Sequence, residues 1–458
     1  MSDVTQLGKY QPYPDYKNSG VEWLGEIPDA WELWKLAHAY DVIGSGTTPP
    51  TNEDKWFGDG VPWVTTGELR ETVVEQTTKN VTFEALNQFS ALKIHPAGSV
   101  VIAMYGATIG RLGVLGIDAT TNQACCVLTQ SQHLYNQYVF YWLYAFRDEI
   151  IKLSSGGGQP NINQEKVASL KITAPDYSHQ KKIVSFLDYE TARIDQLIAK
   201  QQQLIELLKE KRQAVISHAV TKGLNPNAPM KDSGVEWLGQ VPEHWVICKI
   251  KNLASVISKG TTPSTIGAEF IDEGVRFLKA ENIGKSPSVN SDPEFFISEG
   301  TNKQISRSQL KENDVLVIIA GATTGAASIL QKEMLPANTN QAVSFIRPVK
   351  RVFSKWMLSW LATDFSQRVI WMGAVQAAQP NLSMESLGNI PITLPPESEI
   401  QDIISTIDFK LNKFEQLTNK AEETISLMQE RRTALISAAV TGKIDLRGWQ
   451  LPKSEVAA

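Results

Sequence analysis

The stretch KNSGVEWLGEIPDAWELWKL at residues 17–36 returns as KDSGVEWLGQVPEHWVICKI at residues 231–250, with 11 identities in 20 positions at an offset of 214. Four more strings return in the same order. They are SGTTPPT at 45–51 and KGTTPST at 259–265, YGATIGRLG at 105–113 and AGATTGAAS at 320–328, TNQA at 121–124 and 339–342, and QPN at 159–161 and 379–381. EKRQAVISHAVT at 210–221 finally returns as ERRTALISAAVT at 430–441. Collinear repetition over such a long period indicates a duplicated architecture.

Each copy has the same internal order. A Trp/Gly/Pro-rich anchor comes first, then short β-branched runs among turn residues, and finally a long helical pattern without Gly or Pro. We therefore predict an α+β protein with two similar domains in tandem, separated and followed by long helices. The predicted segments are an N-terminal tail (1–16), a first domain (17–177), a central helix and linker (178–228), a second domain (229–397), a C-terminal helix (398–446) and a C-terminal tail (447–458).

The two helical patterns carry apolar residues at heptad spacing, which is typical of a coiled coil. We predict that the helices pair with each other as an antiparallel coiled coil and relate the two halves by a pseudo-two-fold axis. The alternative is that each helix packs only on its own domain. The predicted pairing residues are Leu187, Ile194, Leu197, Leu204, Leu208 and Val215 in the first helix and Ile407, Phe414, Leu417, Met428 and Leu435 in the second.

Composition describes an ordinary globular chain and does not by itself suggest a nucleic-acid binder. The 458 residues are 42% hydrophobic and 20% charged, and the net charge is −5. No apolar run is long enough for a membrane span, and the N-terminus lacks the pattern of a secretory signal. Three cysteines, two of them adjacent, cannot build a disulfide framework. We therefore expect a cytoplasmic protein without membrane contact.

Motifs that carry catalysis are missing from the sequence. There is no GxxxxGK[ST] phosphate loop, because GATIGRLG at 106–113 and GATTGAAS at 321–328 lack the lysine. No proline-rich Asp/Asn turn of an amino-methyltransferase is present, and the six histidines form no metal-binding pattern. We predict no catalytic residue, no metal site and no cofactor in this chain. Two alternatives stay open: a stand-alone DNA methyltransferase or nuclease with an unrecognised site, and a structural coiled-coil scaffold.

The repeated motifs resemble those of specificity subunits of Type I restriction-modification systems. The resemblance rests on SGVEWLGEIPDAW (19–31) and SGVEWLGQVPEHW (233–245), on the passages that follow QPN at 159–188 and 379–408, and on both helix ends. It implies two target-recognition domains, each reading one half of a bipartite, asymmetric site in double-stranded DNA, with helices that set the spacer. It also implies two methyltransferase subunits, and restriction/translocase subunits, as partners in host defence. S-adenosylmethionine, ATP and Mg²⁺ would then belong to those partners.

Comparison of the two copies indicates which residues read DNA. Positions that differ within equivalent loops can read different half-sites, and Arg, Lys, Asn and Glu suit base edges in the major groove. The predicted DNA-binding residues are Ser45, Thr47, Thr48, Thr65, Thr66, Glu68, Arg70 and Arg111 in the first copy and Lys259, Thr261, Thr262, Arg276, Lys279, Glu281 and Asn282 in the second.

Overall fold

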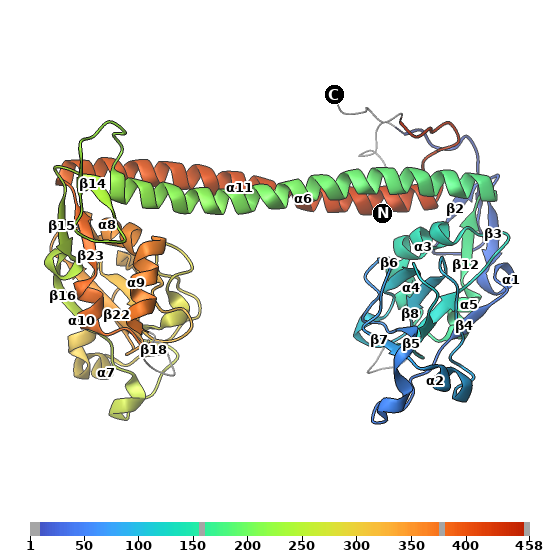
Figure 1. Ribbon diagram of the computed structural model, residues 1–458, viewed down its shortest axis with the longest axis horizontal. Coiled ribbons are helices and arrows are strands. Elements are labelled where there is room, and N and C mark those ends of the chain that lie inside the picture. Colours follow the sequence, from blue (N-terminus) through green and yellow to red (C-terminus); the bar gives the residue numbers. More distant parts are fainter. Residues whose placement is uncertain (1–9, 155–160, 375–380, 453–458) are drawn as a thin grey trace. The chain divides into compact units, whose positions relative to one another are not determined.

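The computed structural model describes residues 10–154, 161–374 and 381–452, which form two compact units. The first unit lies within residues 1–201 and 423–458, and the second comprises residues 202–422. Two long helices, α6 (Tyr177–Lys222) and α11 (Glu397–Val440), contribute to both (Figure 1). Each unit therefore contains the N-terminal part of one long helix and the C-terminal part of the other.

The first unit is built on a five-stranded sheet in the order β4-β11-β8-β9-β6 and a three-stranded sheet in the order β10-β5-β7. Two further strand pairs, β1-β2 and β12-β3, complete its strands. The strands are β1 (Tyr16–Asn18), β2 (Glu26–Pro28), β3 (Glu32–Lys35), β4 (Ile43–Ser45), β5 (Phe57–Val64), β6 (Thr72–Val74), β7 (Lys79–Val81), β8 (Val100–Ala103), β9 (Leu112–Leu115), β10 (Thr120–Thr121), β11 (Cys125–Leu128) and β12 (Lys171–Ala174). Its shorter helices are α1 (Leu36–Ala39), α2 (Phe83–Gln88), α3 (Asn136–Ala145), α4 (Arg147–Lys152) and α5 (Gln164–Ser169).

The second unit repeats this plan. Its sheets have the orders β16-β22-β19-β20 and β18-β17-β21, with the strand pairs β13-β14 and β15-β23. The strands are β13 (Met230–Asp232), β14 (Gln240–Pro242), β15 (Val246–Lys249), β16 (Ala254–Lys259), β17 (Val275–Leu278), β18 (Phe296–Ile297), β19 (Val315–Ile318), β20 (Ala327–Ile329), β21 (Ala337–Thr339), β22 (Val343–Pro348) and β23 (Pro391–Leu394). Its shorter helices are α7 (Glu299–Gln304), α8 (Val352–Leu361), α9 (Asp364–Ala374) and α10 (Met384–Asn389).

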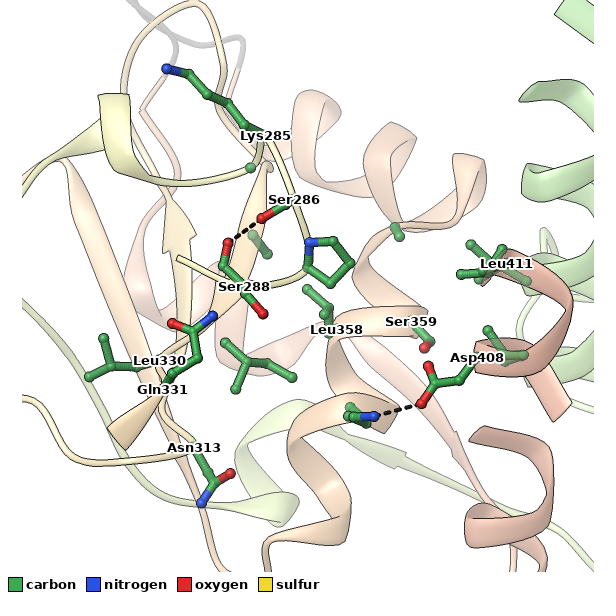
Figure 2. A pocket seen from close by; sticks show the side chains of 18 of the residues that line it. Lys285, Ser286, Ser288, Asn313, Leu330, Gln331, Leu358, Ser359, Asp408 and Leu411 are labelled. Atoms are coloured by element: carbon green, nitrogen blue, oxygen red, sulfur yellow. Dashed lines mark hydrogen bonds and ion pairs between the residues drawn. The ribbon is translucent and has the colours of Figure 1, made fainter. Parts of the chain in front are cut away.

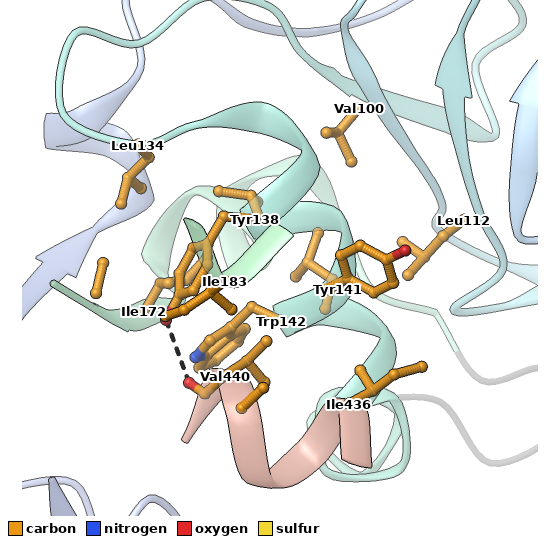
Figure 3. Packing of buried hydrophobic residues seen from close by; sticks show 14 of the residues in the cluster. Val100, Leu112, Leu134, Tyr138, Tyr141, Trp142, Ile172, Ile183, Ile436 and Val440 are labelled. Atoms are coloured by element: carbon orange, nitrogen blue, oxygen red, sulfur yellow. Dashed lines mark hydrogen bonds between the residues drawn. The ribbon is translucent and has the colours of Figure 1, made fainter. Parts of the chain in front are cut away.

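The central strand of each large sheet is buried on both faces because its side chains alternate between two cores. In β8, Val100 and Ile102 pack into the core that contains α3, whereas Val101 and Ala103 pack into a separate core on the other face. Figure 3 shows the first of these cores, in which Trp142 and Tyr138 of α3 lie against Val440 of α11. A continuous run of Val, Ile and Ala suits such a doubly buried strand.

The repeated anchor fixes each unit to the C-terminal end of a long helix. Trp31 packs beside Gly442, which follows α11, and Trp245 packs beside Gly223, which follows α6. Both glycines have positive φ (71° and 74°), a conformation that glycine adopts at little cost at a helix C-terminus. The two tryptophans are almost fully buried. The first anchor and the end of the second long helix therefore belong to one core, although more than 400 residues separate them in sequence.

Within each unit, the long helices pack with their opposite ends together, as an antiparallel pair requires. Ile183 to Ile194 share the first core with Leu435 to Val440, and Ile216 to Val220 share the second with Ile400 to Ile407. Arg432 also forms an ion pair with Asp195 at 3.1 Å.

The predicted pairing residues fall on two stripes along each helix, and the stripe that contains Leu197, Leu204 and Leu417 is wrong by one residue. Leu187, Ile194, Leu208, Ile407 and Leu435 are buried, and Val215, Phe414 and Met428 are half-buried. Leu197, Leu204 and Leu417, however, are 43%, 40% and 41% exposed. Ile205 is buried instead, and Ile198 and Leu411 are half-buried. These residues lie four positions after Gln201, Ile194 and Ile407 of the other stripe, rather than three. Spacings of three and four are both compatible with a heptad, so the sequence pattern alone did not distinguish them.

Candidate nucleic-acid interface

The repeated polar strings come together in each unit. The end of β4 lies against the TNQA string that precedes β11, and Thr48 Oγ1 donates to Gln123 Oε1. The same bond joins Thr262 to Gln341 in the second unit. A Cβ atom on Gly46 would lie 1.6 Å from the carbonyl oxygen of Thr121, so this close approach requires glycine. A Cβ atom on Gly260 would likewise lie 1.9 Å from the carbonyl oxygen of Thr339.

The GAT turn and the residues after QPN adjoin the same place. Met104 N–H donates to the Ala124 carbonyl at 2.7 Å, and the Met104 carbonyl accepts from Ile162 N–H at 2.8 Å. Ile319 makes the two corresponding bonds to Ala342 and Leu382 at 2.8 and 2.7 Å. Residues 159–160 and 379–380 of the QPN strings lie outside the described residues. We call this meeting point of the SGTT, GAT and TNQA strings the repeated-motif cluster. It holds the fold in both units, and its Gln123 and Gln341 are exposed.

Glu68 and Asn282, two predicted base-reading residues, have the same structural task in the two units. Thr65 N–H donates to Glu68 Oε2 at 2.8 Å, and Lys279 N–H donates to Asn282 Oδ1 at 3.0 Å. Burial alone would raise the pKa of the Glu68 carboxyl, but hydrogen bonds from Thr65 and Thr78 leave that pKa below its usual value.

The prediction that Asn282 reads bases is wrong, because its side chain is 1% exposed and also donates to the carbonyls of Asn290 and Pro293 at 3.1 and 2.8 Å. An amide that is buried and bonded in this way cannot reach a base edge. The two residues differ in type between the copies although their role in the turn is the same.

Arg276 and Lys279 are engaged by aromatic side chains of their own unit. Lys279 Nζ lies 4.3 Å from the ring centre of Phe270 and 3.4 Å from that of Phe295. Arg276 donates to Glu294 Oε1 at 3.1 Å, and its guanidinium carbon lies 5.4 Å from the ring centre of Phe296. These cations can meet DNA only at the cost of such contacts. The aromatic partners were missed because Phe270 and Phe295 carry no signal of binding in the sequence.

The remaining candidates lie at or near the surface of their units. Arg70 and Glu281 are exposed, and Ser45, Thr47, Thr66, Arg111, Lys259 and Thr261 are half-buried. Ser45 Oγ donates to Gln164 Oε1 at 3.1 Å. The side chains of Thr66, Arg111, Lys259 and Glu281 form no hydrogen bond or ion pair within the described part of the chain. These four side chains are therefore available to an external ligand.

The described residues contain no group of three or more His, Cys, Asp or Glu side chains that could hold a metal ion. Cys125 and Cys126 are fully buried, and burial raises the pKa of the Cys126 thiol to about 12, so neither is a reactive thiolate at neutral pH. Among the residues with described structure, no helix combines the length and apolarity needed to cross a membrane.

Comparison with known proteins identifies the family. The family model for the Type I restriction modification DNA specificity domain matches residues 28–207 and again residues 242–427. The chain belongs to this family. The prediction of a Type I DNA-specificity subunit, rather than a stand-alone enzyme, is confirmed by this double match. The two matches also show that both units carry the specificity domain.

Relatives of similar length occur in an archaeon and in a bacterium. The MjaVIII specificity subunit of Methanocaldococcus jannaschii is 21% identical over 426 residues, which are 92% of this chain and 94% of the relative. The EcoKI specificity subunit of Escherichia coli K12 is 20% identical over 441 residues, 92% of this chain and 90% of the relative.

Two solved structures confirm the predicted α+β fold with tandem domains and long helices. One chain, from a structure concerned with complex assembly and conformational transition of the type I R-M system, aligns with a TM-score of 0.70 at 15% identity and covers 91% of this chain and 99% of its own length. The HsdS subunit of Thermoanaerobacter tengcongensis aligns with a TM-score of 0.57 at 16% identity. The alignment covers 91% of this chain and 98% of the HsdS subunit.

Proposed function

We propose that the two units of this specificity subunit read the two halves of a bipartite, asymmetric sequence in double-stranded DNA, and that the long helices set the spacer between the halves. The observation that carries this proposal is one scaffold with different surface side chains. Ser45 and Lys259 end equivalent strands, and Arg111 corresponds to Ala326, since their carbonyls accept the same backbone bond from β8 and β19. One scaffold with two sets of side chains suits an asymmetric site.

We further propose that two methyltransferase subunits dock on the long helices and that restriction/translocase subunits join them in the cytoplasm. Apolar side chains turned outward on these helices support the docking: Leu197 and Leu207 of α6 are 43% and 52% exposed, and Phe409 and Leu427 of α11 are 71% and 64% exposed. A partner that covered these side chains would remove their apolar area from water, which favours association. S-adenosylmethionine, ATP and Mg²⁺ would be bound by those partners.

Methylation mapping tests the DNA-reading proposal. The chain and its methyltransferase partner would be incubated with genomic DNA and S-adenosylmethionine, and modified adenines mapped by sequencing. We expect one bipartite motif with a fixed gap. Arg111→Ala should relax discrimination only in the half read by the first unit, and Lys259→Ala only in the other half, by roughly tenfold for a lost base contact. Lys303→Ala, which changes an exposed residue of α7, is the control.

Two results would count against the DNA-reading proposal. A methylation pattern without a bipartite motif would refute the two-headed reading. Label transfer by the chain without its partner would instead favour the alternative, a stand-alone methyltransferase.

A further inference from the structure

The second unit contains a pocket of about 690 Å³ between the loop at 284–288, helix α8 and the two long helices (Figure 2). Its lining includes the polar residues Ser288, Ser359 and Asp408 and the apolar residues Leu358 and Leu411. Arg212 of α6 also lines it. All of these residues belong to the second unit.

The corresponding position in the first unit can be located from the cores. Trp31 packs edge-on against Tyr138, and Trp245 packs edge-on against Trp356. Tyr138 Oη donates to the Thr173 carbonyl at 2.8 Å, and Trp356 Nε1 donates to the Thr393 carbonyl at 2.7 Å. Tyr138 and Trp356 are therefore equivalent positions. Three and six residues further on, the first unit has Tyr141 and Tyr144, whereas the second has Ser359 and Ala362.

In the first unit, these two tyrosines fill the space beneath the long helices. Tyr141 is 8% exposed and its Oη donates to Asp188 Oδ1 at 2.7 Å. The ring centre of Tyr144 lies 5.8 Å from the guanidinium carbon of Arg432. Both rings therefore have a charged partner on a long helix.

The second unit retains the charged partners but lacks the rings. Asp408 and Arg212 stand at the helix positions of Asp188 and Arg432, as the repeated strings place them. Arg212 forms no hydrogen bond or ion pair within the described part of the chain. Asp408 Oδ2 accepts from Lys355 at 2.6 Å, and no described residue donates to its Oδ1. The Arg212 guanidinium and Asp408 Oδ1 thus lie at an open pocket. In the first unit, phenol rings fill the equivalent space.

We propose that this pocket receives a tyrosine side chain of the methyltransferase subunit, which takes the place that Tyr141 and Tyr144 hold in the first unit. The partner's hydroxyl would donate to Asp408 Oδ1, and Arg212 would lie over its ring, as Arg432 lies near Tyr144. The choice of partner rests on the proposed docking of methyltransferase subunits on the long helices, because α6 and α11 supply Arg212, Asp408 and Leu411.

The lining suits a phenol, which has an apolar ring and a polar hydroxyl. It combines apolar Leu358 and Leu411 with the carboxylate of Asp408, while its five basic residues are partly offset by Glu312, Glu333 and Asp408. Because the first unit fills the equivalent space itself, the two docking events are unequal, and only the one at the second unit uses this pocket.

Filling the pocket from within tests the proposal. The double variant Ser359→Tyr with Ala362→Tyr restores the residues of the first unit, and its methyltransferase partner would be titrated while native mass spectrometry resolves the two binding events. We expect one event to weaken by at least tenfold, as for a displaced aromatic anchor, and the other to stay unchanged. Ser359→Thr, which leaves the pocket open, should bind as wild type does.

A second variant keeps the test decisive if the filled variant fails to fold. Arg212→Ala removes only the unpaired cation, so folding should survive, and the same binding event should weaken by about two- to thirtyfold. The pocket proposal would be overturned if the folded double variant, or Arg212→Ala, bound both methyltransferase subunits with wild-type affinity. It would also be overturned if either variant lost DNA binding while its binding of the methyltransferase stayed unchanged. Failure of the wild-type chain to bind the methyltransferase at all would instead refute the proposed function.

Discussion

Replacing Asn282 by alanine distinguishes a structural residue from a base-reading one. The side chain makes three hydrogen bonds inside the second unit, to Lys279 N–H, the Asn290 carbonyl and the Pro293 carbonyl. Each hydrogen bond contributes about 1 kcal/mol net, and a buried partner left unpaired costs about 1–3 kcal/mol. Since water can reach part of this loop, we expect Asn282→Ala to destabilise it by about 2–4 kcal/mol.

Hydrogen exchange is the appropriate assay, because a chain with two compact units has no single free energy of unfolding. A loss of about 2–4 kcal/mol corresponds to exchange that is roughly 30 to 1,000 times faster for protected amides near Asn282, such as that of Asn290, which donates to the Asn282 carbonyl. Amides in the first unit should exchange as before. Glu281→Ala changes the exposed neighbour and serves as the matched control.

Two observations together would contradict the structural role of Asn282. Unchanged exchange in Asn282→Ala, together with relaxed discrimination at one adenine of the methylation motif, would show that Asn282 reads DNA. The burial and hydrogen bonding of the side chain would then describe only one of its conformations.

Three further predictions address the scaffold, the spacer and catalysis. Gly260→Ala should unfold or strongly destabilise the second unit, because the new Cβ would lie 1.9 Å from the Thr339 carbonyl oxygen; hydrogen exchange should show this, whereas Gly300→Ala should be tolerated. Inserting seven residues after both Gln203 and Ala421 keeps the heptads in phase and lengthens the helices by about 10 Å. The mapped spacer should then grow by up to about three base pairs at 3.4 Å each; a folded, active variant with its original spacer would refute the role of the helices. The purified chain alone, given S-adenosylmethionine, ATP and Mg²⁺, should neither methylate nor cut DNA, and labelled or cleaved product would contradict this.

The sequence predicted the architecture well because the repeat is exact at positions that the fold constrains. Trp31 and Trp245 are almost fully buried in equivalent cores, and Gly46 and Gly260 lie too close to a neighbouring carbonyl for any Cβ atom. The helical pattern identified one heptad stripe correctly and misplaced the other by one residue. Leu197 and Leu204 are apolar but exposed, and a periodic pattern cannot tell an apolar residue in a helix pair from one that faces a partner.

The candidate site was less predictable, because a difference between two copies has more than one cause. Glu68 and Asn282 differ although both cap the same turn, so variation alone did not identify a DNA-reading residue. Lys279 has the charge of a phosphate or base contact, yet two phenylalanines hold its ammonium group. Such partners come from loops distant in sequence and become visible only in the folded unit.

The central claim, that each unit reads its own half-site on a shared scaffold, is tested most directly by making the two units the same. A chain in which the second domain, residues 229–397, is replaced by the first domain, residues 17–177, keeps both long helices. Its methylation motif would be mapped by sequencing in the presence of the methyltransferase subunit. We predict a symmetric motif that contains the half-site of the first unit twice, in inverted orientation, with the other half-site lost. An active chimaera that still methylates the original asymmetric motif would contradict the account.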